Sequence, residues 1–497
     1  CSLSNLSELL PSGGGQNEVE FVASGTLPNG QAVILNSDGT VTAVAETSVA
    51  GIVIPETASP VNFSGSGSTH ITSQFSPSTA NVFVVAYRDG ANGYGNSIVG
   101  TVSGTSISFG TPSLFHSGLS FIISIAFDDS NPSKFVITYS DMANSYYGTA
   151  VIGTISGTSL SYGTAVVFNS GATNQDSQVD YIASNKFAVA YGDAANSNYG
   201  TAIIGTVSGT SISFGSEYVF SAVNFTFRIY IKKDPNATDI FVVAYGENVS
   251  NVGKAVVGTV SGNSISYGSA TIFESSFLNS CGVSFDPSTA NKFAIMFSTS
   301  SALQAIIGTR SGTSISFGSA ASIQSNSVTH PAVAYDLNTA NRFVVAYRND
   351  GNSNYGTATV CTVSGSTITV GTSYVYNSYL SNYNAICFDS NNSGKFTVSF
   401  YNANGTVGST ILGNLEGSIV STNLTSTNLL GISSQAITSG ATGVINTWGG
   451  LNEGQSSLTP ASIYYVQSNG TISTVSTSPA QKIGQAISAT TLNILDL

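Results

Sequence analysis

Short runs of β-branched and aromatic residues follow one another along the middle of the chain, separated by Gly, Ser, Asn and Asp. This pattern predicts β-strands joined by tight turns, because an amphipathic helix would need a helical period of apolar residues. One representative stretch predicts four strands, labelled A to D in chain order: Ser124–Asp128, Lys134–Tyr139, Thr149–Ser156 and Ser159–Asn169. A Gly-containing turn joins C to D, and Asp or Pro begins the turn that joins A to B.

The segment Gly100–Gly110, GTVSGTSISFG, recurs with small changes along the chain. Further copies begin, at intervals of 50 to 53 residues, at Gly153, Gly205, Gly258, Gly308, Cys361 and, in degenerate form, Gly413. Such regular spacing indicates a repeat architecture. Seven units of four antiparallel strands predict an all-β fold, a seven-bladed β-propeller with a repeat of about 52 residues. An open β-solenoid is the structural alternative.

One segment before the first complete copy resembles the end of a strand D. Pro60–Phe63 reads PVNF, and the end of strand D at Ala165–Asn169 reads AVVFN. We expect Pro60–Phe63 to complete the last blade from the N-terminal side. Such a strand would tie the ring shut and remove an exposed sheet edge.

The links between strands differ in how much they vary among the copies. In a propeller the A–B and C–D links share one face, and the B–C and D–A links share the other. The A–B and C–D links are nearly uniform, whereas the D–A links vary strongly, as at His116–Ser124, Ser221–Ile229 and Asn377–Ala385. Because loops on a rigid scaffold commonly carry function, we expect the functional surface on the B–C and D–A face. Neutral drift of surface loops is the alternative.

Four B–C loops share a pattern of Asp, Asn and Tyr, which makes these residues the candidate ligand-binding residues. They are Asp89, Asn92, Tyr94, Asp141, Asn144, Tyr147, Asp193, Asn196, Tyr199, Asp350, Asn352 and Tyr355. The tyrosine rings suit stacking on sugars, and they suit packing between blades equally well. The oxygens suit Ca²⁺, but each loop offers one carboxylate, so capping of turn backbone groups is the simpler interpretation. No other cofactor is expected.

Charged residues make up only 8% of the 497 residues, and the formal net charge is −12. A negatively charged protein repels polyanions, so nucleic-acid binding is not expected. No apolar run is long enough to span a bilayer, so membrane insertion is not expected. The hydroxyl- and amide-rich surface that this composition implies suits sugars or neighbouring proteins.

The sequence lacks catalytic motifs. Its histidines, His70, His116 and His330, belong to no recurring acid–base constellation, and there is no GxSxG, HExxH or Walker-type segment. We therefore do not expect an enzyme. The cysteines of the repeat region lie in predicted strands of different copies, so buried free thiols are expected. These are Cys281, Cys361 and Cys387.

The two ends of the chain lack the repeat and predict a second module. Phe21–Val44 and Ile463–Val475 each contain a strand, an Asn/Asp-Gly turn and a second strand. We expect an N-terminal arm and hinge at 1–18 and one β-rich module formed by 19–58 with 425–497. The propeller, 59–424, would be inserted between its two parts.

These flanks also carry a family resemblance. The segments ASGTLPNGQAVILNSDGTV, GISSQAITSGATGVI, GLNEGQSSLTPASIYYVQSNGTIST and KIGQAISATTLNIL resemble terminal modules of tailed-bacteriophage virion proteins. The similar proteins are tail-fibre, head-fibre and appendage proteins of marine phages and cyanophages. The resemblance implies a virion location and other virion proteins as partners, and it carries over no catalytic residues. Cys1 and the long propeller insertion depart from the family's pattern.

Together these observations predict a homo-oligomeric virion fibre or appendage protein. Its propeller would attach to a glycan or protein receptor on the host surface, or to neighbouring virion proteins. A bacterial cell-surface lectin or adhesin, with Cys1 as a processed lipoprotein terminus, is the alternative. A glycan-cleaving enzyme is the third candidate.

Overall fold

The computed structural model describes residues 17–50, 59–173, 176–415, 418–425, 427–476 and 481–495. Most of the predicted N-terminal arm, including Cys1, lies outside the described residues. The chain separates into two compact units, Cys1–Val49 with Ser418–Leu497, and Ala50–Gly417. The described residues form β-strands and two short 3₁₀ helices, so the fold is all-β. In the part of the chain that is described, no helix is long and apolar enough to cross a membrane.

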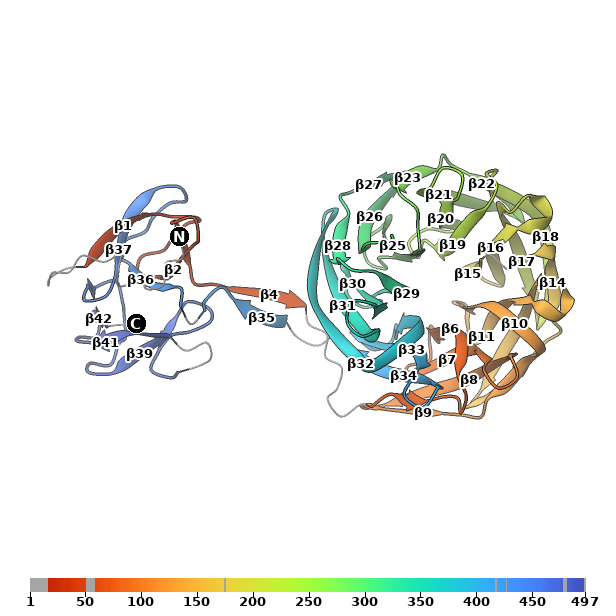
Figure 1. Ribbon diagram of the computed structural model, residues 1–497, viewed down its shortest axis with the longest axis horizontal. Coiled ribbons are helices and arrows are strands. Elements are labelled where there is room, and N and C mark those ends of the chain that lie inside the picture. Colours follow the sequence, from red (N-terminus) through yellow and green to blue (C-terminus); the bar gives the residue numbers. More distant parts are fainter. Residues whose placement is uncertain are drawn as a thin grey trace. The chain divides into compact units, whose positions relative to one another are not determined.

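Copy three shows the repeating unit in its simplest form. It consists of β15 (Ser177–Ala183), β16 (Lys186–Asp193), β17 (Tyr199–Ser208) and β18 (Ser211–Ser221). These strands are antiparallel neighbours in that order and correspond to strands A to D. Strand A lies nearest the centre of the ring and strand D at its edge (Figure 1).

The other copies follow the same plan. Copies one and two contain β6 (Ser68–Phe75), β7 (Val82–Asp89), β8 (Tyr94–Ser103), β9 (Ser106–Phe109), β10 (Ser113–Asp128), β11 (Asn131–Asp141), β12 (Tyr147–Ser156), β13 (Ser159–Tyr162) and β14 (Val166–Ala172). Copies four and five contain β19 (Thr226–Lys233), β20 (Ile240–Glu247), β21 (Val252–Ser261), β22 (Ser264–Tyr267), β23 (Thr271–Glu274), β24 (Ser280–Phe285), β25 (Lys292–Ser298), β26 (Leu303–Ser311), β27 (Ser314–Phe317) and β28 (Ala321–Gln324). Copies six and seven contain β29 (Val328–Tyr335), β30 (Arg342–Asn349), β31 (Tyr355–Ser364), β32 (Thr367–Phe388), β33 (Lys395–Asn402) and β34 (Val407–Asn414).

Two of the predicted strand boundaries were wrong. Strand A of copy two is the second half of β10, whose first half is the outer strand of copy one, because the D–A link stays extended and paired. β32 serves copies six and seven in the same way. The predicted strand D at Ser159–Asn169 is two strands, β13 and β14, separated by Gly163–Ala165.

The recurring glycine and aromatic residue of the repeat pack against each other. The ring of Phe187 on strand B covers Gly205 on strand C so closely that a Cβ there would lie 2.2 Å from the ring. The outer-strand ring of Phe214 meets Phe187 edge-on at 5.9 Å. In copy six Cys361 replaces the glycine, and Val370 stands in place of the outer aromatic ring. The repeated motif is therefore a core-packing signal.

Gly205→Ala is expected to lower the free energy of unfolding by about 2 kcal/mol, because the added methyl group overpacks a buried ring. Gly209→Asn is the matched control: Gly209 lies in the C–D turn with φ +63° and no neighbouring atom within 4 Å of a Cβ. Asn tolerates this conformation, so the control should change stability by less than about 1 kcal/mol. Chemical denaturation of both variants measures the difference. Equal effects would contradict the packing role.

The last copy receives a strand from the N-terminal side. β5 (Val61–Asn62) pairs antiparallel with β34, and the Phe63 N–H donates to the Gly408 carbonyl at 2.9 Å. This pairing agrees with the expected role of Pro60–Phe63. Each innermost strand contacts that of the next copy, and β32 contacts β6. The sheets are thus arranged around a common centre, as in a propeller (Figure 1).

The second unit is built from both ends of the chain. Its first sheet has the order β1 (Glu18–Val22), β37 (Thr442–Asn446), β36 (Leu429–Ser433), β2 (Ala32–Leu35) and β3 (Val41–Ala43). Its second sheet has the order β38 (Leu451–Asn452), β42 (Leu492–Ile494), β41 (Gln481–Ala486), β39 (Ile463–Val466) and β40 (Ile472–Ser473). β4 (Glu46–Ala50) pairs with β35 (Ser418–Thr422). Ile34, Leu429 and Ile483 share one buried core, so the two flanks fold together.

Candidate functional site

Side-chain bonds between neighbouring copies identify the links that share a face. Lys186 Nζ, at the end of an A–B link, donates to the carbonyl of Gly262 in a C–D turn at 2.6 Å. Toward the other face, Asn169 Nδ2 before a D–A link donates to Asp193 Oδ1 at a B–C loop, at 3.0 Å. Equivalent bonds recur in other copies. The predicted grouping of the links is confirmed.

Three of the candidate carboxylates are built into the fold. Asp89, Asp141 and Asp193 end strand B, and each accepts the N–H two residues further on, at 2.8 to 3.0 Å. Each also binds a residue of the preceding D–A connection, for example His116 to Asp141 at 3.3 Å. Their oxygens therefore cap the B–C turn and hold the D–A link, as the simpler interpretation predicts.

Asp350 is not equivalent to the other three. Asn349 pairs with Tyr355 as Asp193 pairs with Tyr199, so Asn349 occupies the repeated position. Its Oδ1 accepts the Gly351 N–H at 3.1 Å. Asp350 lies one residue later and forms an ion pair with Arg348 at 2.7 Å. The prediction treated Asp350 as the equivalent of Asp89, Asp141 and Asp193, and this is one residue too far along the chain.

The remaining candidates stay in their separate loops of copies one, two, three and six. The exposed loop tips carry Asn92, Asn144, Asn196 and Asn352. The half-buried tyrosines that begin strand C are Tyr94, Tyr147, Tyr199 and Tyr355. Within the described ranges, no group of three or more His, Cys, Asp or Glu is placed to hold a metal ion. A ligand-binding role for these loops stays a prediction.

A different set of residues converges at the start of strand A. In five copies this strand has a bulge near its D–A end, where its register with strand B shifts. A non-glycine residue there has a φ between +48° and +53°: His70, Ile122, Arg228, His330 and Tyr383. L-residues rarely adopt this conformation, so the same strained geometry recurs in five copies. Bulges reorient side chains and are common beside functional sites.

Four aromatic side chains, from copies six, seven, one and two, meet at the B–C and D–A end of the propeller-like unit. The Tyr383 ring lies between two histidine rings, with centroids 4.3 Å from His330 and 5.3 Å from His70. Phe121, which precedes a bulge residue, continues the row at 5.2 Å from His70. We call Phe121, His70, Tyr383 and His330 the inner-rim cluster. All four residues are only partly buried.

Polar groups flank both ends of the inner-rim cluster. The guanidinium carbon of Arg88 lies 4.2 Å from the centre of the Phe121 ring. At the other end, Arg348 donates to Asn382 Oδ1 at 2.6 Å and to Thr329 Oγ1 at 2.7 Å. The row therefore combines aromatic faces with fixed hydrogen-bonding groups, the two elements by which proteins orient a small polar ligand.

Both histidines of the cluster are uncharged at neutral pH. Burial lowers the pKa of His70 to about 4, and Arg88 adds to the lowering. Burial also lowers the pKa of His330 to about 4, and here Arg348 adds to the lowering. Each neutral imidazole offers one donor and one acceptor.

The protein is expected to lose stability as the pH falls from 6.5 to 4. The folded-state pKa of His70 and His330 lies below the ordinary value of 6.5, so the unfolded chain binds more protons in this range. Their contribution is fully present above pH 6.5 and declines as the pH approaches 4. Urea unfolding across this range should show a smaller decline for a His70→Gln/His330→Gln variant. Equal declines would exclude the two histidines as the cause.

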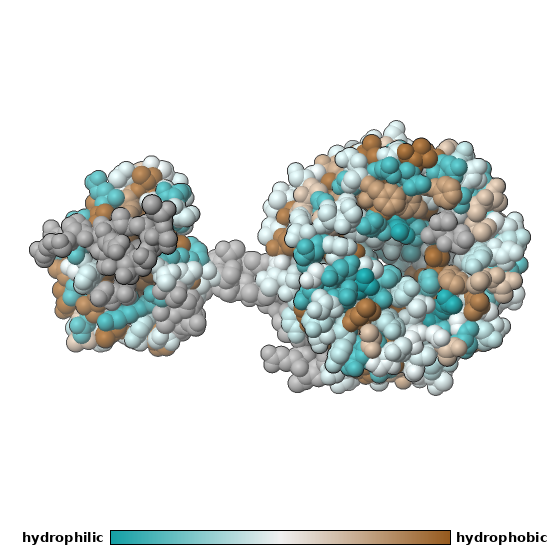
Figure 2. Space-filling model, in the orientation of Figure 1, coloured by the Kyte–Doolittle hydropathy of each residue, from teal (hydrophilic) through white to brown (hydrophobic). Residues whose placement is uncertain are grey.

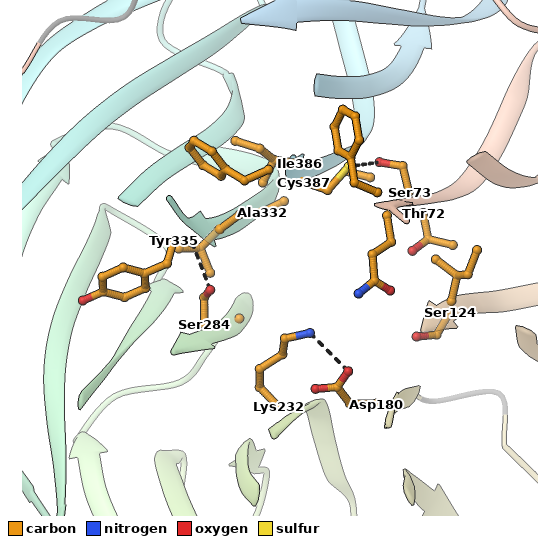
Figure 3. Close-up of a pocket in the computed structure, with 18 of the residues that line it drawn as sticks. Thr72, Ser73, Ser124, Asp180, Lys232, Ser284, Ala332, Tyr335, Ile386 and Cys387 are labelled. Atoms are coloured by element: carbon orange, nitrogen blue, oxygen red, sulfur yellow. Dashed lines mark hydrogen bonds and ion pairs between the residues drawn. The ribbon is translucent and has the colours of Figure 1, made fainter. Parts of the chain in front are cut away.

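A cavity of about 570 Å³ occupies the channel between the inner strands and reaches the A–B links. Its polar groups are largely engaged (Figure 3): Lys232 pairs with Asp180 at 3.2 Å, and Ser284 Oγ accepts the Tyr335 N–H at 3.0 Å. Aliphatic side chains such as Ile386 line much of the rest. The cysteines at 281, 361 and 387 are buried and free, as predicted.

The sequence interpretation missed the inner-rim cluster. It had marked the variable D–A links, and three of these links contain Phe121, Arg228 and Tyr383. The copies differ chemically at the bulge position, which carries His70, Ile122, Arg228, His330 or Tyr383, and this divergence is the signal that the sequence offers. Positive φ itself has no signal at Ile122 and Tyr383, because β-branched and aromatic residues favour extended backbone, whereas histidine tolerates positive φ better.

No protein-family model matches the chain, and no curated protein matches it in sequence. Its fold resembles that of the BP39L lectin from Burkholderia pseudomallei, with a TM-score of 0.52, 9% identity, and coverage of 71% of this chain and 99% of that one. AofleA from Arthrobotrys oligospora has a TM-score of 0.40, 9% identity and coverage of 68% and 93%. The intramolecular trans-sialidase from Ruminococcus gnavus has a TM-score of 0.42, 10% identity and coverage of 71% and 96%. The first likeness, at this identity, concerns the propeller-like fold alone.

Proposed function

We propose that this chain is a carbohydrate-binding attachment protein that binds its ligand at the inner-rim cluster. The observation that carries the proposal is the bulge in five copies, which brings unlike side chains to one end of the ring. Uniform repeats need no strained backbone at this position. A shared ligand site explains both the strain and the divergence of these residues.

The chemistry of the inner-rim cluster favours a sugar as the ligand. The apolar face of a pyranose packs on an aromatic ring, while its hydroxyl groups need donors and acceptors at the edge. Tyr383 and Phe121 offer the rings, and neutral His70 and His330 with Asn382 offer the polar partners. BP39L, whose fold is similar, is a lectin, and this adds support. So does the pale, intermediate hydropathy of much of the visible surface (Figure 2).

We further propose that the seven copies form one closed seven-bladed propeller. Support comes from the pairing of β5 with β34 and from the contact of Tyr383 in copy seven with His70 in copy one. Closure matters for function, because the inner-rim cluster spans the junction between the last copy and the first. An open array would separate these two residues.

The location on a virion and assembly with other virion proteins remain proposals that rest on the flanking segments. A homo-oligomer would multiply weak sugar contacts by avidity. Mass spectrometry of purified phage particles from an infected culture is the test. Recovery of this chain in the particles would support a virion location, whereas recovery only from the bacterial envelope would favour the surface-adhesin alternative.

Binding of a glycan array by the full chain tests the proposed function. We expect binding to a restricted set of glycans without release of reducing ends. Failure to bind any glycan at millimolar concentrations would reject the proposal. Turnover of a bound glycan would show an enzyme instead.

A further inference from the structure

The arginines of this acidic chain are unevenly distributed. There are only five, and the formal net charge of the chain is −12. Arg310 and Arg342 are engaged in ion pairs with Asp234 and Asp336 of A–B links. The other three lie at the B–C and D–A end: Arg88, Arg228 and Arg348.

Two of these three arginines lack an ion-pair partner among the residues that the structure describes. Arg88 lies over the ring of Phe121, and the guanidinium carbon of Arg228 lies 5.8 Å from the centre of the Phe227 ring. Stacking on a ring leaves the N–H groups at the edge of a guanidinium free to donate. Arg348 is neutralised by Asp350 at 2.7 Å.

Arg88 contacts the inner-rim cluster through the ring of Phe121, and Arg228 occupies the equivalent bulge position of copy four. In keeping with this placement, Arg88 is among the causes that lower the pKa of His70, and Arg228 is among those that lower the pKa of His330. Asp176 is one of the nearby carboxyl groups, and its Oδ2 accepts the backbone N–H of Arg228 at 2.6 Å. Desolvation raises the pKa of Asp176 to about 6, and Arg228 opposes this rise, so the carboxyl group is still mostly ionised at neutral pH. This end of the propeller therefore carries two guanidinium groups that have no ion-pair partner among the described residues, although carboxylates such as Asp89 and Asp176 also lie there.

We propose that the carbohydrate bound at the inner-rim cluster is acidic, with carboxylate or sulfate groups that pair with Arg88 and Arg228. This inference rests on the proposed function and adds the chemical class of the ligand. A guanidinium donates two parallel hydrogen bonds to a carboxylate or sulfate, and such charge-assisted bonds are about twice as strong as neutral ones. The acidic remainder of the protein discourages unspecific binding of anions, so recognition is confined to this end.

Matched polysaccharides that differ only in charge test the inference on the full chain. One pair is polygalacturonate and its carboxyl-reduced form, and the other is a sulfated galactan and its desulfated form. We expect at least about tenfold tighter binding of one acidic form than of its neutral partner at low salt, weakening as salt screens the charges. The pair that shows the preference distinguishes carboxylate from sulfate.

Substitutions of the two arginines test whether they cause the preference for the acidic polysaccharide. Arg228 is exposed, so Arg228→Gln should fold normally and reduce the preference for the acidic form several-fold. Arg88→Gln should also reduce the preference for the acidic form several-fold. The unfolding temperature of this variant shows whether loss of the stack on Phe121 destabilises the fold. Lys186→Gln is the control, because Lys186 binds Gly262 on the opposite face. Its preference should stay unchanged.

The outcomes separate this inference from the function on which it rests. Equal binding of acidic and neutral forms would overturn the acidic class and leave carbohydrate binding intact. A preference for acidic forms that survives both arginine substitutions would also overturn the inference. Absence of binding to these polysaccharides and to every glycan of an array would reject the proposed function itself.

Discussion

Phe63→Ala is expected to lower the free energy of unfolding by about 4 kcal/mol, the usual cost of removing a buried phenylalanine ring. Phe63 is 4% exposed and directly follows the two-residue strand β5. Its ring lies over Gly408 of copy seven, where a Cβ would be 2.3 Å from the ring. The same ring is 5.0 Å from Tyr87 of copy one. It therefore spans the junction between the last copy and the first.

Phe168→Ala provides the matched control. Phe168 occupies the same place between copies two and three, over Gly148 and 5.2 Å from Tyr191. Denaturant unfolding should give similar losses for the two variants. Hydrogen exchange should distinguish them, because only Phe63→Ala should accelerate exchange in β34. A loss below about 1 kcal/mol for Phe63→Ala would mean that β5 does not hold the ring together.

Tyr383→Ala is expected to weaken binding of the glycan selected on the array at least 30-fold, about 2 kcal/mol, the size of an interface hot spot. Tyr383 is the centre of the inner-rim cluster, and its ring contacts both His70 and His330. Its removal takes away the stacking face and leaves the two histidines without the ring that orients them. Titration calorimetry on the full chain measures the change in affinity.

Two further variants separate binding from folding. Tyr383→Phe keeps the ring, so its affinity should stay within about fivefold of the unchanged protein. Tyr374→Ala removes an exposed tyrosine from the outer half of the same strand, β32, and should leave binding unchanged. Equal losses for Tyr383→Ala and Tyr374→Ala would contradict the assignment of the site.

Much of the fold could be predicted from the sequence, because its information is local and repeated. Most copies contain a glycine on strand C and a phenylalanine on strand B, as at Gly205 and Phe187. This recurring pair indicates both the strands and how they pack. The likeness of Pro60–Phe63 to the end of a strand D indicated its pairing partner across almost the whole repeat region. Capping by Asp193 followed from the ordinary behaviour of Asp at turns.

The candidate site could not be predicted in this way. Tyr383 and His70 are more than 300 residues apart in the sequence, and only the meeting of copies seven and one brings their rings together. Their positive φ accompanies the shift in pairing with strand B, and the ordinary preference of Tyr383 for extended backbone opposes it. In copy six the prediction chose Asp350, whereas the repeated turn position is held by the neighbouring Asn349.

The location of a bound glycan tests the central claim most directly. A crystal structure of the full chain with the tightest ligand from the array would provide it. We predict that a sugar ring packs on Tyr383 and that its hydroxyl groups bind His70 or His330. A ligand bound in the channel near Asp180 and Lys232, or on the outer strands, would contradict this account.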